Sequence, residues 1–346
     1  MVTLKDVAEK CNVTTATVSN IINGKSKASA ETRERVLDTI KELGYQPNVI
    51  ARGLRGKKTG TIGIIVEDIT LFDAPKIIVS IMNYCAETGY HAVIENMRYY
   101  MRTEIATSMD EKLKYKKDVA DAVAKMRAMR ADGLIFLACH ARKNIDVLPP
   151  DLDFPVVMVY SYIDNPEIPV YVLDDENCSY NAVKYLIDNG HRKIGIIAGA
   201  NDNLHAQKRI ISYQKALFDA GIPFDPELVY ADKWSRKCGY DGLKKFVSMG
   251  VTAVYCLNDE MAGGAYDYAR EAGLEIPKDI SVVGHDNREI ADYFNPKLTT
   301  IDLPLYELGF RAARRIVAMI EGKPPVEGDQ TVLQCTFIPR ESVKKI

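Results

Sequence analysis

From residue 60 onward, short runs rich in β-branched residues alternate with amphipathic segments of helical length. The runs lie at 61–66, 91–95, 133–137, 156–160, 170–173, 193–198, 253–257 and 280–284. Helical segments separate most of them, at 74–88, 111–130, 176–189, 204–220, 235–249 and 260–272. This alternation predicts an α/β fold of parallel sheets flanked by helices. The number of runs exceeds the number of strands in a sheet of usual size, so we predict two lobes. A ligand would bind in the cleft between them, at the carboxyl ends of the strands.

The first 45 residues have the pattern of three short helices around one small core. Thr3 and Asp6 form a capping box, Thr14 and Ser29 can cap two further helices, and Gly44 can end the third. Apolar residues recur at helical spacing in these segments: Val7, Ala8, Val18, Ile21, Ile22, Val36, Leu37, Ile40 and Leu43.

We therefore divide the chain into a helical head over 1–46, a hinge and linker over 47–59, and a two-lobed body over 60–346. The break at Gln46-Pro47-Asn48 and the polar run at 55–60 mark the linker. We assign about 60–160 and 290–320 to the first lobe, and about 161–289 and 321–341 to the second.

The head is basic and the body is acidic. Residues 1–60 contain 11 Lys and Arg against 6 Asp and Glu, in a chain whose formal net charge is −2. A phosphate-binding module joined to a separate sensor would have this distribution. Chance clustering of surface lysines would give the same charge distribution, so charge alone leaves both interpretations open.

Residues 8–21 fit a helix–turn–helix. The turn lies at 10–13, with the small Ala8 where the two helices would cross. The second helix has polar residues at its outer start, and Val18 and Ile21 point inward. DNA-reading helices have this polarity because their first residues approach base edges. An ordinary helical hairpin is the alternative from the pattern alone.

Ordered motifs along the whole chain closely resemble the lac-repressor family. Those of the head are Thr3-Leu4-Lys5-Asp6-Val7-Ala8, Val13-Thr14-x-x-Thr17-Val18-Ser19, Asn23-Gly24 and Leu43-Gly44-Tyr45-x-Pro47-Asn48. Those of the body include Ile62-Gly63-Ile64-Ile65-Val66, Gly190-His191-Arg192-Lys193-Ile194, Asn258-Asp259-Glu260-Met261-Ala262 and Ile280-Ser281-Val282-Val283-Gly284. The resemblance implies a transcription regulator, most often a repressor, with a helix–turn–helix head and a periplasmic-binding-protein-like body. Such a protein binds a pseudo-palindromic double-stranded operator as a homodimer, under control of a small-molecule effector.

The resemblance also implies DNA contacts. Thr15, Ala16 and Asn20 would face bases in the major groove. A second set would hold phosphates: Thr3, Thr17, Ser19 and Asn23.

A short hinge helix over 49–54 is implied as well. Asn48 would cap it, Ala51 would lie in it, and Leu54 would wedge between base steps in the minor groove. A mere flexible linker is the alternative. We expect this helix to form only in the complex of the dimer with DNA.

For the effector site, the resemblance implies Arg209, Asn258 and Asp286, which come at strand ends or helix starts. A guanidinium, an amide and a carboxylate that converge match neighbouring sugar hydroxyls, which donate and accept together. Phe72 and Trp234 would offer flat faces for stacking. Tyr160 is a weaker candidate, for which core packing is the favoured reading. We expect a sugar or sugar derivative, with a purine or a docked phosphorylated carrier protein as alternatives.

Two stretches depart from the family pattern. Leu303 stands where relatives often carry a polar ligand contact, so we doubt that contact. The segment 96–112 is long and rich in aromatic and methionine side chains. It could extend the dimer contact, roof the pocket or form a solvated loop.

We expect no cofactor, no metal site and no enzymatic activity. The five histidines lack metal-ligand spacing, and the seven cysteines include no Cys-x-x-Cys pair. His285-Asp286 has no nucleophile elbow near it, which leaves an enzyme on an α/β fold as a distant alternative. Residues 1–6 have no apolar signal core and no run is long enough for a membrane span, so we expect a cytoplasmic protein.

Overall fold

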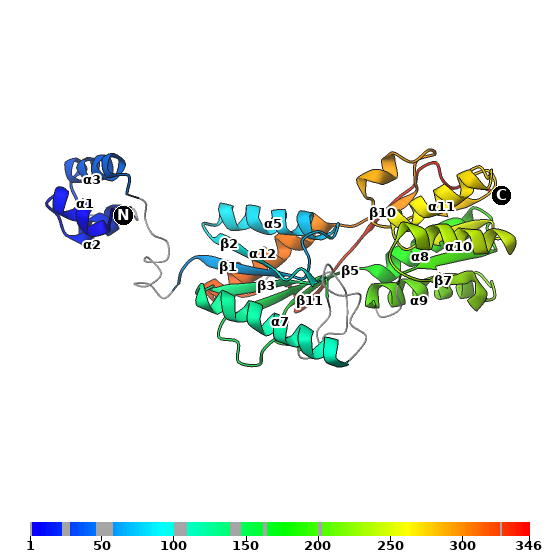
Figure 1. Ribbon diagram of the computed structural model, residues 1–346, viewed down its shortest axis with the longest axis horizontal. Coiled ribbons are helices and arrows are strands. Elements are labelled where there is room, and N and C mark those ends of the chain that lie inside the picture. Colours follow the sequence, from blue (N-terminus) through cyan, green and yellow to red (C-terminus); the bar gives the residue numbers. More distant parts are fainter. Residues whose placement is uncertain are drawn as a thin grey trace. The chain divides into compact units, whose positions relative to one another are not determined.

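A computed structural model describes residues 2–22, 28–45, 58–99, 109–138, 147–161, 165–199, 203–325 and 327–346, with the backbone alone for 109–112. The chain forms two compact units, Met1–Gly60 and Thr61–Ile346, which we treat separately as the head and the body (Figure 1). In the described ranges, no helix combines the length and apolar character that a membrane span requires.

The head is a bundle of three helices, α1 (Leu4–Lys10), α2 (Thr15–Ile22) and α3 (Ala30–Leu43). Val7, Val18 and Val36, one from each helix, are completely buried in its core. The predicted caps are present, because Thr3 and Asp6 form a capping box and the hydroxyls of Thr14 and Ser29 accept backbone N–H groups.

The prediction that Leu37 lies in the core of the head was wrong, since 41% of it is exposed. Val36, Ile40 and Leu43 are spaced by four and three residues and share one stripe of α3. Leu37 is displaced from Val36 by about 100° around the helix. A bundle of three short helices covers only the stripe of α3 that contains Val36, Ile40 and Leu43, and leaves Leu37 outside it.

The first lobe of the body contains a six-stranded sheet in the order β11-β5-β4-β3-β1-β2, with every pair parallel. Its strands are β1 (Thr61–Val66), β2 (His91–Asn96), β3 (Gly133–Leu137), β4 (Val156–Val159), β5 (Val170–Leu173) and β11 (Gln330–Leu333). The central strands are completely buried, as their continuous apolar runs predict.

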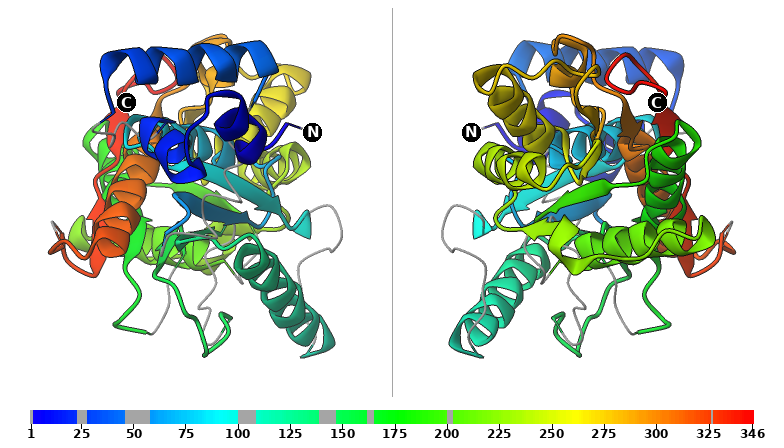
Figure 2. Two further views of the ribbon diagram at one scale, coloured as in Figure 1. Left: turned by 90° about the vertical axis from the view of Figure 1, so that its left-hand side faces the viewer. Right: turned by 90° about the vertical axis from the view of Figure 1, so that its right-hand side faces the viewer.

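Helices cover both faces of this sheet. On one face, α5 (Ala74–Glu87) and α12 (Leu305–Glu321) pack over Ile62 and Ile64 of β1. On the other, α7 (Met109–Ala128) packs over Ile65. Seen from either end of the body, α12 and α7 lie on opposite sides of the sheet (Figure 2).

The second lobe contains a four-stranded parallel sheet in the order β7-β6-β8-β9. Its strands are β6 (Ile194–Ala198), β7 (Val229–Ala231), β8 (Ala253–Cys256) and β9 (Ser281–Val283). Its helices are α8 (Asp175–Asp188), α9 (Leu204–Asp219), α10 (Arg236–Ser248) and α11 (Asp259–Glu271), with short 3-10 turns η1 (Pro226–Leu228) and η2 (Glu289–Asp292). Helix α8 packs against α9, and α10 against α11.

The chain passes repeatedly between the two lobes. It leaves the first lobe between β5 and α8, returns through β10 (Thr300–Asp302) to α12, and leaves again after β11. Strand β12 (Thr336–Ile338) then pairs antiparallel with β10 (Figure 1).

Two predicted lobe assignments were therefore wrong in part. Within 161–289 and 321–341, which we assign to the second lobe, β5 and β11 pair with each other in the sheet of the first, whereas β6 to β9 form the sheet of the second as predicted. Strand identity follows from local pattern, whereas the choice of sheet depends on pairing with distant residues. The predicted α/β body of two lobes is otherwise confirmed.

Candidate functional site

The outer surface of α2 carries the predicted DNA-reading residues. Ala16 and Asn20, four residues apart on one face, are both exposed, and Thr15 is half-buried beside them. Val18 and Ile21 fix the opposite face of α2 in the core. The turn before α2 is tight, because the Val13 N–H donates to the Ala8 carbonyl and Asn12 adopts a left-handed φ of 49°.

The predicted phosphate-holding hydroxyls lie at helix starts. The hydroxyl of Thr3 donates to the Asp6 carboxylate at 2.8 Å, and that of Thr17 lies 2.9 Å from the Thr14 hydroxyl. Ser19 is half-buried on α2. The remaining predicted DNA contacts lie outside the described residues: Asn23, Asn48, Ala51 and Leu54.

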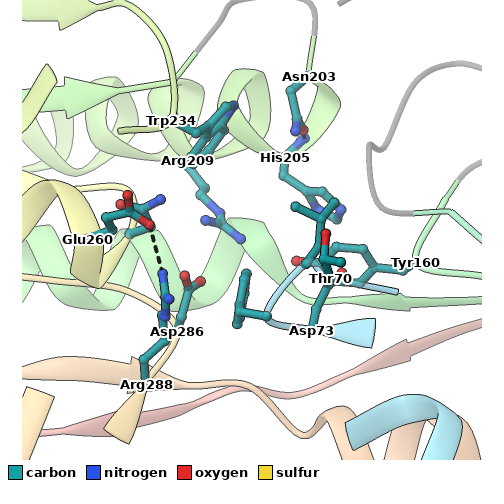
Figure 3. Close-up of a pocket in the computed structure, with 13 residues that line it drawn as sticks. Thr70, Asp73, Tyr160, Asn203, His205, Arg209, Trp234, Glu260, Asp286 and Arg288 are labelled. Carbon is teal, nitrogen blue, oxygen red and sulfur yellow. Dashed lines mark hydrogen bonds and ion pairs between the residues drawn. The ribbon is translucent and has the colours of Figure 1, made fainter. Parts of the chain in front are cut away.

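The body contains a cavity of about 290 Å³ between its lobes (Figure 3). Its first-lobe wall comes from the connection after β1 and from the end of β4. Its second-lobe wall comes from the starts of α9 and α11, the approach to α10 and the segment after β9. The lining residues are Thr70, Leu71, Phe72, Asp73, Tyr160, Asn203, His205, Arg209, Trp234, Asn258, Glu260, Asp286 and Arg288.

Arg209 points from α9 toward the middle of this pocket and is only 2% exposed (Figure 3). Its Nε donates to Asp175 Oδ1 at 2.8 Å, and its Nη1 donates to the Leu257 carbonyl at 2.8 Å. Burial opposes ionisation of Asp175, but His205 and Arg209 outweigh it and hold the pKa of Asp175 below its ordinary value. The guanidinium is thus held in one orientation by a buried carboxylate.

His205 lies one turn before Arg209 on the same face of α9. Its Nδ1 hydrogen-bonds to the other oxygen of Asp175, so one carboxylate orients both side chains. The imidazole packs against the ring of Tyr160 from the first lobe, with the ring centroids 4.5 Å apart. Tyr160 is buried in the core, as we favoured, and its ring also lines the pocket.

Asn258 belongs both to the start of α11 and to the pocket. Its Oδ1 accepts the Met261 N–H at 2.7 Å, which caps the helix and leaves the amide nitrogen for other partners. Asp259 instead accepts from the Thr300 hydroxyl at 2.6 Å and from the Arg288 N–H at 2.7 Å, and it is completely buried.

Asp73 and Asp286 each present a carboxylate to the pocket. Among the described residues, Oδ2 of each is buried without a hydrogen-bond partner. Burial raises the pKa of Asp73 to about 7. Burial, reinforced by Asp259, holds the pKa of Asp286 well above its usual range. Buried polar atoms of this kind are expected where a ligand supplies the missing partner.

Trp234 forms an aromatic wall of the pocket. A Cβ added at Gly199, after β6, would come within 1.9 Å of its indole ring, so only glycine there allows the ring this position. The indole Nε1 is buried and, within the described chain, lacks a hydrogen-bond partner. It can donate to a ligand that stacks nearby.

Arg288 joins the two lobes at the pocket. Its guanidinium carbon lies 5.5 Å from the centroid of the Phe72 ring of the first lobe. Its Nη1 donates to Glu260 of α11 at 3.0 Å, the contact drawn in Figure 3.

The structure brings together the predicted pocket residues, which are Phe72, Arg209, Trp234, Asn258 and Asp286. Leu303, for which we doubted a ligand contact, is buried and does not line the pocket. We missed Asp73 and His205. Asp73 follows a strand end, and His205 precedes Arg209 by one turn, so both positions carried a usable signal.

Two family models match the chain. The model described as bacterial regulatory proteins, lacI family, matches residues 3–48, and a periplasmic binding protein-like domain matches residues 183–343. The transcriptional regulator RegA of Clostridium saccharobutylicum is 34% identical over 342 residues, 98% of each chain.

Two solved structures extend this similarity to the fold. The lac repressor dimer bound to operator and the anti-inducer ONPF matches with a TM-score of 0.85 and 28% identity over 99% of both chains. The regulator CelR in complex with cellobiose matches with a TM-score of 0.68 and 27% identity, over 99% of this chain and all of that one. The resemblance that the motifs indicated is thereby confirmed, and the chain belongs to the lacI family of bacterial regulatory proteins.

Proposed function

We propose that the chain is a DNA-binding transcription regulator whose affinity for its operator changes when a sugar or sugar derivative binds between the lobes of its body. The observation that carries this proposal is the pocket of a lacI-family body, in which Arg209, Asp286 and Asn258 converge beside Trp234. Sugar hydroxyls both donate and accept, and their carbon faces stack on aromatic rings. A neighbour of the same fold is a complex with cellobiose, which supports a carbohydrate.

The ligand would contact both lobes at once. Phe72, Asp73 and Tyr160 belong to the first lobe, and Arg209 and Trp234 to the second. A ligand that contacts both walls stabilises one relative orientation of the two lobes over the others. In a homodimer on a pseudo-palindromic operator, that change would alter the spacing of the paired hinges and heads. Thr15, Ala16 and Asn20 would read bases there.

The first test is operator binding by the full-length protein. Fluorescence anisotropy with palindromic duplexes from its own genome should reveal a preference for some of them, with one dimer per duplex. A thermal-shift screen of sugars, sugar phosphates and nucleobases should then identify ligands, which are retested for their effect on operator affinity. If the protein preferred none of these duplexes, the proposal that it is a sequence-specific DNA-binding regulator would be wrong. If only nucleobases changed the operator affinity, the proposal that the effector is a sugar would be wrong.

The second test places the ligand in the pocket. We expect Arg209→Ala to abolish the ligand response and to keep operator binding, since Arg209 lies in the body. Asp286→Asn is a milder second variant that leaves the Asp175 ion pair intact. Lys208→Ala is the matched control, because Lys208 directly precedes Arg209 in α9 and pairs with Glu176 at the surface at 2.9 Å. An unchanged response in both pocket variants would exclude this site.

A further inference from the structure

Both arginines of the described pocket lining are ion-paired with carboxylates of the protein. Arg209 is ion-paired with Asp175 at 2.8 Å, and Arg288 with Glu260 at 3.0 Å. Each guanidinium therefore already has a carboxylate counter-charge, which a ligand anion would have to share. A phosphate that entered would have to compete with these carboxylates for its counter-charge.

Two further carboxylates face the same space from opposite lobes. Asp73 comes from the connection after β1, Asp286 follows β9, and they are drawn on either side of the space into which Arg209 points (Figure 3). Both are more than nine-tenths buried, and Oδ2 of each lacks a hydrogen-bond partner within the described residues. The pocket therefore has an excess of acidic groups that await a donor.

The position of Asp73 is unusual for an aspartate. It is the residue directly before α5, where an aspartate side chain ordinarily accepts a backbone N–H of the first turn. Here the side chain makes no capping hydrogen bond and is directed to the pocket instead. Oδ2 of Asp73 is thus left without a partner in the described chain and is available to a ligand.

We propose that the pocket admits unphosphorylated sugars and rejects their phosphate and carboxylate derivatives, and that Asp73 is a specificity-determining residue for this choice. The inference rests on the proposed function and names the chemical class of its ligand. A hydroxyl or an ammonium donates to Asp73 and Asp286, whereas an anion finds two carboxyl groups and, in the described pocket lining, only arginines that are already ion-paired. Burying an anion without a counter-charge is costly.

The test is a charge series on one sugar skeleton, measured by isothermal titration of the full-length protein. On the glucose skeleton the probes are glucosamine, glucose, glucuronate and glucose 6-phosphate. Parallel series use galactose, ribose and cellobiose with their phosphate esters. For any skeleton that binds, we expect the phosphate to bind at least 100-fold more weakly than the neutral sugar, and the amine at least as tightly. A phosphate or uronate that binds as tightly as its neutral parent overturns the proposal.

Asp73→Asn tests the residue itself, and Asp73→Ser removes the carboxyl group in a second way should the first variant misfold. Either variant should narrow the ratio between the affinities for neutral sugar and phosphate at least tenfold. Asp188→Asn is the matched control, because it removes a charge paired with Lys184 on the surface of the same body and should leave the ratio unchanged. An unchanged ratio in both Asp73 variants removes Asp73 as the determinant. If no sugar and no ester binds while operator binding persists, the proposed sugar effector fails instead.

Discussion

At the scale of single residues, Asp73 connects the pocket to the stability of the body. Its pKa of about 7 lies above the value of 3.8 for a free aspartate, so between about pH 4 and pH 7 the folded chain holds a proton that the unfolded chain has released. The free energy of unfolding therefore falls as the pH rises through this range. Asp73→Asn should remove this contribution, a gain on the order of 4 kcal/mol at pH 8.

Urea denaturation at pH 4, 6 and 8 measures this effect. We expect the variant and the original chain to be similarly stable at pH 4 and to diverge as the pH rises. Burial also raises the pKa of Asp259 to about 7. Asp259 therefore contributes equally to the pH dependence of the free energy of unfolding in both proteins. Equal stability at pH 8 would contradict the assigned protonation of Asp73.

In the head, Asn20 and Ser19 are neighbours with different expected tasks. Asn20 is exposed and, by its amide, can distinguish a base pair, so Asn20→Ala should relax preference at one operator position. Ser19→Ala should weaken binding to all sequences alike, since a phosphate contact carries no sequence information. Affinities for operators with single base-pair changes, at fixed salt, separate the two outcomes. A uniform loss for Asn20→Ala would refute base reading.

At the scale of elements, the close packing of α10 against α11 depends on glycine. A Cβ added at Gly264 of α11 would lie 1.8 Å from the Arg236 carbonyl oxygen of α10. The backbone of one helix would have to move, so Gly264→Ala should destabilise the body by about 2 kcal/mol or more. Gly328→Ala is the control, because nothing lies within 4 Å of a Cβ there. If Gly264→Ala and Gly328→Ala had the same melting temperature, this packing of α10 against α11 would be contradicted.

The same scale explains what could be predicted from the sequence. Helices and buried strands with a long periodic pattern, such as α9 and β1, were placed to within one residue. Strands β7, β10 and β12 span three residues each and are only partly buried, so they lack the apolar run by which the equally short β9 was predicted. The pocket residues Arg209 and Asp286 were predicted because strand ends and helix starts line clefts. Asp73 was missed because an aspartate before a helix ordinarily acts as a cap.

At the scale of the whole molecule, the opposite charges of head and body separate two binding events. Contacts of a basic head with phosphates release counterions, so operator affinity should fall at least 100-fold between about 50 and 200 mM salt. Affinity for an uncharged sugar in the body should change less than twofold over the same range. Anisotropy and calorimetry on one preparation measure both. A salt-insensitive operator complex would contradict phosphate contacts by the head.

The position of β11 has a consequence for synthesis on the ribosome. The first lobe begins at β1, but the outermost strand beside β5 comes from residues 330–333, after all four strands of the second sheet have been made. The ribosome thus supplies the last strand of the later sheet before that of the earlier one. A chain that stopped directly after α12 would lack β11 and leave β5 as the unpaired edge of the first sheet, although all four strands of the second sheet were already present.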